Sequence, residues 1–188
     1  MAKRDLRQFD FEKVAKLDKD MWRAYYNHQF LKLFILAVRF IRTQQCLNWY
    51  LTIKLVYHSS AAAADYRIRK GYENYERPLR HLIKFFQIIS DHSQQPFDFH
   101  KAAELELKWW NVDRYPDRFE TTREQSLAEA MAVVYKVKAE NLSDYGRHRA
   151  AAMKIPNHEG DKQAVKPDWQ KVESLLIKSW QSLHEAVQ

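Results

Sequence analysis

Residues that form turns are scarce in this chain, whose 188 residues include three glycines and five prolines. A sheet protein of this size needs many tight turns, and such turns use glycine, proline and asparagine. Strand-like alternation is also lacking, and apolar residues recur instead every three or four positions. The sequence therefore predicts an all-α protein, with residues 1–188 forming a single domain built as a bundle of six or seven helices.

Four further features of the sequence narrow the class of protein. A single cysteine, Cys46, excludes an internal disulfide and fits a reducing compartment. No stretch of 18 residues is free of charged side chains, so the sequence predicts no transmembrane helix. The N-terminal residues lack the apolar core of a secretory signal, and we expect a cytoplasmic protein. No glycine-rich phosphate loop or nucleophile motif is present, which leaves open whether the protein is an enzyme.

Helical spacing and capping residues divide the chain into segments. Residues 10–42 are expected to form one long helix that is apolar on two sides. A long second helix from residue 47 is expected to be interrupted at Pro78, and residues 78–90 to form a third. Later helices are expected at 98–114, after the capping threonines 121–122, at 143–153 and after Pro167. Residues 1–8 are expected to be an N-terminal tail, and residues 155–167 a mobile loop.

Two of these segments begin with nearly the same sequence. Residues 9–22 align with residues 97–110, and seven of the fourteen aligned positions are identical. Both stretches begin Phe-Asp-Phe, which places Asp10 and Asp98 as helix N-caps. The match suggests an internal pseudo-repeat of the first and fourth helices, and shared capping chemistry is the alternative explanation.

The repeat also marks a candidate ligand site. Asp18 precedes Trp22 by four residues, as Glu106 precedes Trp110, so each pair shares one face of its helix. Packing of the two helices would bring the carboxylates together, beside aromatic side chains that commonly line pockets. The hypothesis is a pocket for a small, partly apolar and anionic ligand. Its predicted ligand-binding residues are Asp18, Trp22, Arg23, Tyr26, Glu106, Trp110 and Arg114.

Cofactor and metal sites have less support. His100 and Glu104 stand four apart and are weak candidates for metal binding, but the Glu-x-x-His pairs of dimetal bundles are missing. We therefore predict no metal and no cofactor, and keep a metal-dependent bundle enzyme as the second alternative. A stripe of basic residues runs from Arg67 to Lys84. Its favourable ion pairs, such as Glu73 with Arg77, indicate a solvated face rather than a nucleic-acid interface.

The net charge of +7 lies entirely in the first half of the chain. Residues 1–100 contain 17 Lys and Arg against 10 Asp and Glu, whereas residues 101–188 contain 14 of each. The alternative function is therefore an interaction module without pocket chemistry, whose basic half contacts an acidic partner or the surface of a membrane. The sequence gives no oligomeric state.

Overall fold

The computed structural model describes residues 3–68, 75–156 and 167–188. Within these ranges the regular structure is helical, and no β-strand is present. Two short 3-10 turns, η1 (Pro116–Arg118) and η2 (Ala139–Leu142), flank α6. The described residues form eight α-helices, where six or seven were expected: α1 (Phe11–Tyr26), α2 (Phe30–Gln45), α3 (Trp49–Ile68), α4 (Glu76–His92), α5 (Phe99–Arg114), α6 (Arg123–Tyr135), α7 (Ser143–Lys154) and α8 (Trp169–Val187).

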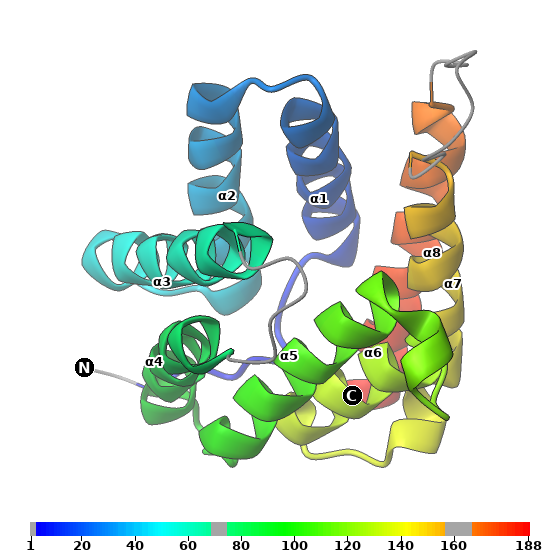
Figure 1. The fold of residues 1–188 in the computed structure, drawn as a ribbon. Coiled ribbons are helices and arrows are strands. Elements are labelled where there is room, and N and C mark those ends of the chain that lie inside the picture. Colours follow the sequence, from blue (N-terminus) through cyan, green and yellow to red (C-terminus); the bar gives the residue numbers. More distant parts are fainter. Residues whose placement is uncertain (1–2, 69–74, 157–166) are drawn as a thin grey trace.

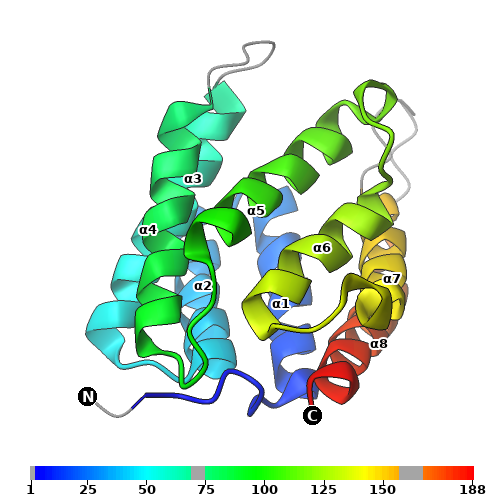
Figure 2. The ribbon, with the colours of Figure 1, turned by 90° about the horizontal axis from the view of Figure 1, so that it is seen from below.

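The helices form a closed circuit (Figure 1). Each helix packs against the one before it and the one after it in the sequence, and α8 completes the circuit by packing on α1. Figure 2 shows α3 and α4 side by side on one flank and α7 and α8 on the other. One continuous apolar core receives side chains from all eight helices. Residues of α1, α5, α7 and α8 that point inward therefore meet in the interior of the circuit.

The prediction of one helix over residues 10–42 was wrong, because the chain reverses at residues 27–29. α1 and α2 are antiparallel neighbours joined by this turn. His28 adopts the left-handed conformation (φ 55°), and Gln29 N donates to Ala24 O at 2.9 Å. The turn contains neither glycine nor proline, so composition gave no sign of it. Folding back also lets two apolar faces pack on each other, where one straight helix would extend about 50 Å.

The third helix expected at residues 78–90 is present as α4, which is two residues longer at each end. α3 is described to Ile68, Tyr75 is not helical, and Pro78 lies in the first turn of α4. A proline is tolerated in the first turn because the amide it removes has no partner within the helix there. The expected mobile loop at residues 155–167 falls almost entirely outside the described residues.

Helix capping follows the sequence closely. The Asp10 carboxylate accepts from Lys13 N, and the Asp98 carboxylate accepts from Lys101 N, both at 3.0 Å. Thr122 and Gln125 form the expected capping box at the start of α6. Both Phe-Asp-Phe starts therefore serve as helix N-caps, which is the shared chemistry offered as the alternative to a repeat. In the circuit, α1 packs on α2 and α8, and α5 packs on α4 and α6.

The described part of the expected N-terminal tail is held against the bundle. Arg4 N donates to His92 O at 2.8 Å, and Gln94 N donates to Arg4 O at 2.7 Å. Leu6 and Phe9 are buried in the core. Among the described helices, none has both the length and the apolar character required to cross a membrane.

Candidate functional site

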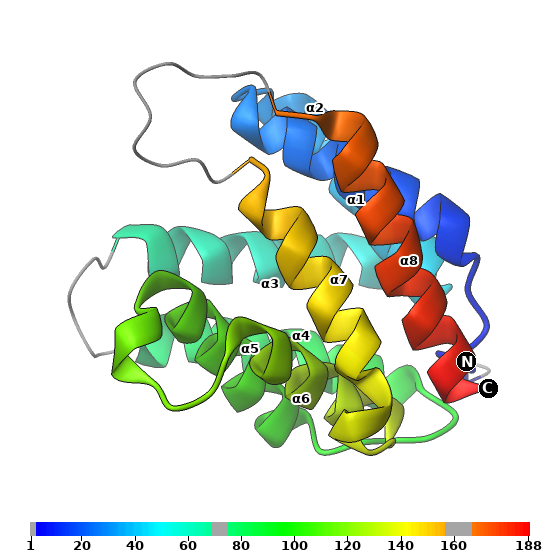
Figure 3. The same cartoon turned by 90° about the vertical axis from the view of Figure 1, so that its right-hand side faces the viewer.

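Asp18 of α1 is a buried charge, with 1% of its surface exposed. Its Oδ2 atom accepts from Arg149 Nη1 of α7 at 2.6 Å and from Trp180 Nε1 of α8 at 2.9 Å. A buried carboxylate that lacks such partners is strongly destabilising. Asp18 therefore connects α1 to two other helices, α7 and α8. Figure 3 shows α7 and α8 side by side.

The Arg149 guanidinium lies among charges and rings. Burial acts to lower the pKa of Arg149, but the charge and hydrogen bond of Asp18, together with Tyr145 and Glu106, outweigh burial and raise it. The guanidinium carbon is 5.5 Å from the Trp22 ring centre and 5.6 Å from that of Trp180, within cation–π range. The charge of Glu106 acts on the same guanidinium. The carboxylates at the two aligned positions of the repeat thus both act electrostatically on one arginine, and Asp18 is bonded to it.

Glu106 of α5 has a different environment from Asp18. Its Oε1 atom accepts from Trp110 Nε1 at 3.0 Å, one turn along the same helix. Burial raises the Glu106 pKa, while the neighbouring indole donors and the charge of Arg149 act to lower it. Tyr145 of α7 is buried close to both carboxylates, and burial raises its pKa to about 12. The interior therefore contains one carboxylate bonded to a guanidinium and an indole, and a second whose pKa is raised by burial.

The remaining predicted site residues lie elsewhere or have other partners. Arg23 and Tyr26 are exposed at the C-terminal end of α1. Arg114 donates to Tyr66 O at 3.0 Å and stacks 3.7 Å from the centre of the Tyr66 ring. Tyr66 in turn donates to the carbonyl oxygen of Trp110 at 2.8 Å. Neither arginine proposed for ligand binding is bonded to Asp18 or Glu106 in the described structure.

Sequence reasoning missed Arg149, which joins the two halves of this cluster. A signal was present in the spacing of Leu142, Tyr145, Arg149 and Ala152, which follows a helical apolar line. The other three of these residues are buried. An arginine on such a line needs an acidic partner in the core, and Asp18 is that partner.

The weak metal candidates are both exposed. His100 and Glu104 lie on the outer side of α5, where Lys101 Nζ is 3.9 Å from Glu104 Oε2. Across the part of the chain that the structure describes, no three side chains of His, Cys, Asp or Glu are grouped as metal ligands.

Most of the large apolar side chains that are exposed lie on the first three helices. Of the eleven exposed large hydrophobic side chains among the described residues, ten fall between residues 25 and 57. Leu31 is 77% exposed and Tyr50 66%. We call this set the aromatic face. It comprises Tyr25, Tyr26, Phe30, Leu31, Phe34, Ile35, Trp49, Tyr50, Ile53 and Tyr57.

The charge around the aromatic face has one sign. The segment from residue 21 to residue 64 contains five Lys and Arg and no Asp or Glu. Arg42 stacks 4.1 Å from the Trp49 ring centre, and Lys54 Nζ lies 4.8 Å from that of Tyr50. Cationic groups are therefore interleaved with exposed rings along this surface.

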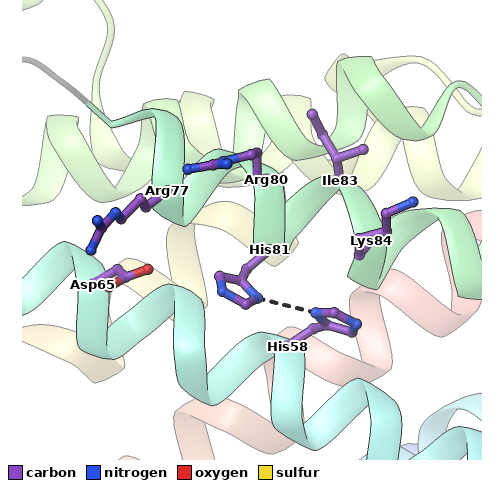
Figure 4. Close-up of a pocket in the computed structure, with 7 residues that line it drawn as sticks. All are labelled: His58, Asp65, Arg77, Arg80, His81, Ile83 and Lys84. Carbon is purple, nitrogen blue, oxygen red and sulfur yellow. Dashed lines mark hydrogen bonds between the residues drawn. The ribbon is translucent and has the colours of Figure 1, made fainter.

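Two open hollows border this region. One, of about 930 Å³, lies between α1, α2 and the start of α3 and is lined by Lys13, Lys16, Arg39, Arg42 and Trp49 among others. The second, of about 530 Å³, lies between α3 and α4 (Figure 4). In the second hollow His58 and His81 face each other with Nδ1 atoms 3.1 Å apart, and Arg77 extends toward Asp65. Neither set of lining residues includes Asp18 or Glu106.

Comparison of the chain with protein-family models, with curated proteins and with solved structures gave no match.

Proposed function

We propose that the protein is an interaction module that binds anionic membrane surfaces through its aromatic face. The observation that carries this proposal is the concentration of exposed apolar side chains in a segment free of acidic residues. Contiguous apolar patches on a protein surface mark sites of interaction. Aromatic rings interleaved with Lys and Arg are typical of surfaces that lie at the boundary between lipid headgroups and acyl chains.

The end of the α1–α2 hairpin is the part of this face best placed to enter a lipid surface. Tyr25 and Tyr26 precede the turn, and Phe30 and Leu31 follow it. All four side chains are exposed, and the hairpin turn lies at the upper edge of the molecule in Figure 1. Full burial of one such side chain contributes roughly 1.5–3 kcal/mol. Exposed Lys32 beside them would add attraction to anionic headgroups.

Vesicle co-sedimentation tests the proposal. The protein should bind phosphatidylserine-containing vesicles more strongly than neutral phosphatidylcholine vesicles, and added salt should weaken this binding. Replacing both Leu31 and Phe34 by Ser removes two apolar side chains that would be buried in the lipid surface. The vesicle affinity should fall about tenfold or more, and each tenfold loss of affinity corresponds to about 1.4 kcal/mol. Phe119→Ser removes an exposed ring outside the aromatic face and is the matched control.

Other outcomes would contradict the membrane proposal. Absence of binding to anionic vesicles at low salt would end it. Binding to an acidic polypeptide such as polyglutamate, without binding to vesicles, would assign the face to an acidic protein partner. The protein could also be a dimer in solution. If the double variant Leu31→Ser with Phe34→Ser were then a monomer, the aromatic face would be assigned to self-association.

A second candidate function is binding of a small ligand at the interior cluster. It is supported by the position of Glu106, whose charge acts on Arg149 as that of Asp18 does and whose pKa is raised by burial. Because Arg23 is exposed and Arg114 is bonded to Tyr66, the anionic character first expected of the ligand loses its basis. Two carboxylates acting on one guanidinium favour a neutral or cationic group instead.

A thermal-shift screen of neutral and cationic metabolites tests this candidate, since a ligand that binds the folded state raises its melting temperature. Glu106→Gln keeps an acceptor for Trp110 and removes the charge. The variant should retain its melting temperature and lose the stabilisation by any ligand that the screen identifies. Equal stabilisation of both proteins by each such ligand would place the binding site elsewhere, and a large loss of stability in the variant would mark Glu106 as structural.

A further inference from the structure

Four cationic side chains surround the hollow between α1 and α2. Lys13 and Lys16 extend from α1, and Arg39 and Arg42 extend from α2. On each helix the two cations are three residues apart, so they share a face. Because α1 and α2 are antiparallel neighbours, the two pairs line one hollow of about 930 Å³ from opposite sides. We call this hollow the cationic groove.

Asp10 and Asp20 also line the cationic groove, so its lining residues carry a formal charge of +2 rather than +4. The Asp10 carboxylate is occupied as the N-cap of α1. Asp20 Oδ1 is 3.0 Å from Lys19 Nζ. None of the four cations forms an ion pair with a carboxylate of the described residues. Like charges held on packed helices repel one another, and this repulsion is relieved when an anion binds between them.

The groove also has an apolar wall. Trp49 lies at its edge, with Arg42 stacked on the indole ring, and Leu17 lines it from α1. A guanidinium presents several N–H donors in a plane and binds phosphate oxygens in pairs, while an ammonium adds charge without a fixed geometry. Two arginines opposite two lysines therefore suit a compact group that carries two negative charges and several acceptor oxygens.

We infer that the cationic groove binds a phosphate monoester, with Arg39 and Arg42 contacting its oxygens and Lys13 and Lys16 neutralising its charge. The ester can be a free metabolite or the headgroup of a lipid, because both present the same dianion. The inference does not depend on membrane binding by the aromatic face. A soluble phosphate ester tests the groove without vesicles, so failure of one proposal leaves the other intact.

The experiment is a titration of the full chain with inorganic phosphate and with glycerol phosphate at low ionic strength, followed by melting temperature and amide chemical shifts. Both ligands should raise the melting temperature and shift amides of α1 and α2. Arg39→Gln should weaken binding about tenfold, which corresponds to about 1.4 kcal/mol, and Lys16→Gln should weaken it less. Lys171→Gln removes an exposed cation of α8 and is the charge-matched control.

Stability without ligand provides a second readout, independent of binding. Removing one of four repelling cations should leave the melting temperature unchanged or raise it, so Arg39→Gln should be no less stable than the wild type. Destabilisation by Arg39→Gln and by Lys16→Gln in the absence of phosphate would mean that the cations serve the fold, and would overturn the inference. Equal phosphate stabilisation of wild type, Arg39→Gln and Lys16→Gln would overturn it as well.

Two vesicle types of equal surface charge separate the sources of the phosphate group. Phosphatidate exposes a phosphate monoester, whereas phosphatidylserine does not. A preference for phosphatidate vesicles that Arg39→Gln removes would assign the groove to a lipid headgroup. Binding of glycerol phosphate without such a preference would assign it to a soluble ester. No binding of either soluble ligand and no preference between the vesicles would refute the site.

Discussion

Two arginine–tryptophan contacts show how differently the interior and the surface of this molecule use the same residue types. Arg149 lies over Trp22 and Trp180 inside the circuit and is bonded to a buried carboxylate. Arg42 lies over Trp49 on the outside, where both side chains are exposed. The interior pairs its polar groups with one another, whereas the first three helices leave apolar and cationic groups facing outward. This contrast separates residues that hold the fold from residues available to a partner.

The largest effect should come from breaking the interior pair. Arg149→Met leaves Asp18 buried without its cation, and loss of one partner of a buried ion pair costs about 3–5 kcal/mol. Arg42→Met removes the exposed counterpart and should cost no more than about 1 kcal/mol. Urea unfolding of both variants measures the two values. Similar losses for the two variants would show that the contrast between interior and surface is wrong.

The next largest loss of stability should come from a substitution at Gly146, where α7 lies close to the start of α6. A Cβ atom added at Gly146 would collide with the backbone carbonyl group of Glu124. Alanine normally stabilises a helix by about 1 kcal/mol relative to glycine. Gly146→Ala should instead destabilise the protein by roughly 1–3 kcal/mol, because one of the two backbones must move.

Thermal unfolding measures this change. Ser174→Ala, at an exposed position within α8, reports helix propensity without a collision and should be neutral or slightly stabilising. If Gly146→Ala were also stabilising, the two helices could separate freely at this point, and the interior would be less tightly packed than the geometry indicates.

The two repeated helix starts should give smaller and equal effects. Asp10→Ala and Asp98→Ala each remove an N-cap hydrogen bond, at a cost of about 1 kcal/mol. Because the two sites are on different helices, the costs should add in the double variant. Asp10→Asn and Asp98→Asn keep a capping oxygen and should remain close to wild-type stability in the same unfolding measurements. A much larger loss for one site would show that its helix start has a role beyond capping.

The sequence predicted features that depend on local chemistry. Asp10, Asp98 and Thr122 cap their helices as expected, since a capping side chain bonds to amides two or three residues away. The helical spacing of Trp169, Val172, Leu176, Trp180 and Leu183 predicts an inward face for the last helix, and the last four of these residues are buried.

Features that depend on contacts between distant segments were not predicted. The reversal at His28 is formed without glycine or proline, and packing of α1 against α2 stabilises it. Asp18 was singled out, but its partner Arg149 is 131 residues away and no local rule connects them. The aromatic face was also missed. Its apolar residues occur at helical spacing, which predicts burial equally well, and exposure depends on which neighbours the fold supplies.

The smallest predicted effect concerns the histidine pair on the surface between α3 and α4. Burial lowers the pKa of His58, and the charges of His81, Lys54 and Lys84 lower it further. Asp65 lines the same hollow as an opposing negative charge, and Arg77 and Arg80 add positive charge. The folded protein therefore binds a proton at His58 less readily than the unfolded chain does.

The sign of the pH dependence follows from that difference. Neutral His58 supports the fold fully above the ordinary imidazole pKa of about 6.5, and this support is lost as the pH falls through the lower pKa of the folded state. His58→Gln cannot take up the proton, so its melting temperature should fall less than that of the wild type on acidification over this range. His100→Gln, which removes an exposed imidazole of α5, is the matched control. Parallel pH profiles for wild type and His58→Gln would show that the pair is as freely solvated as the rest of the surface.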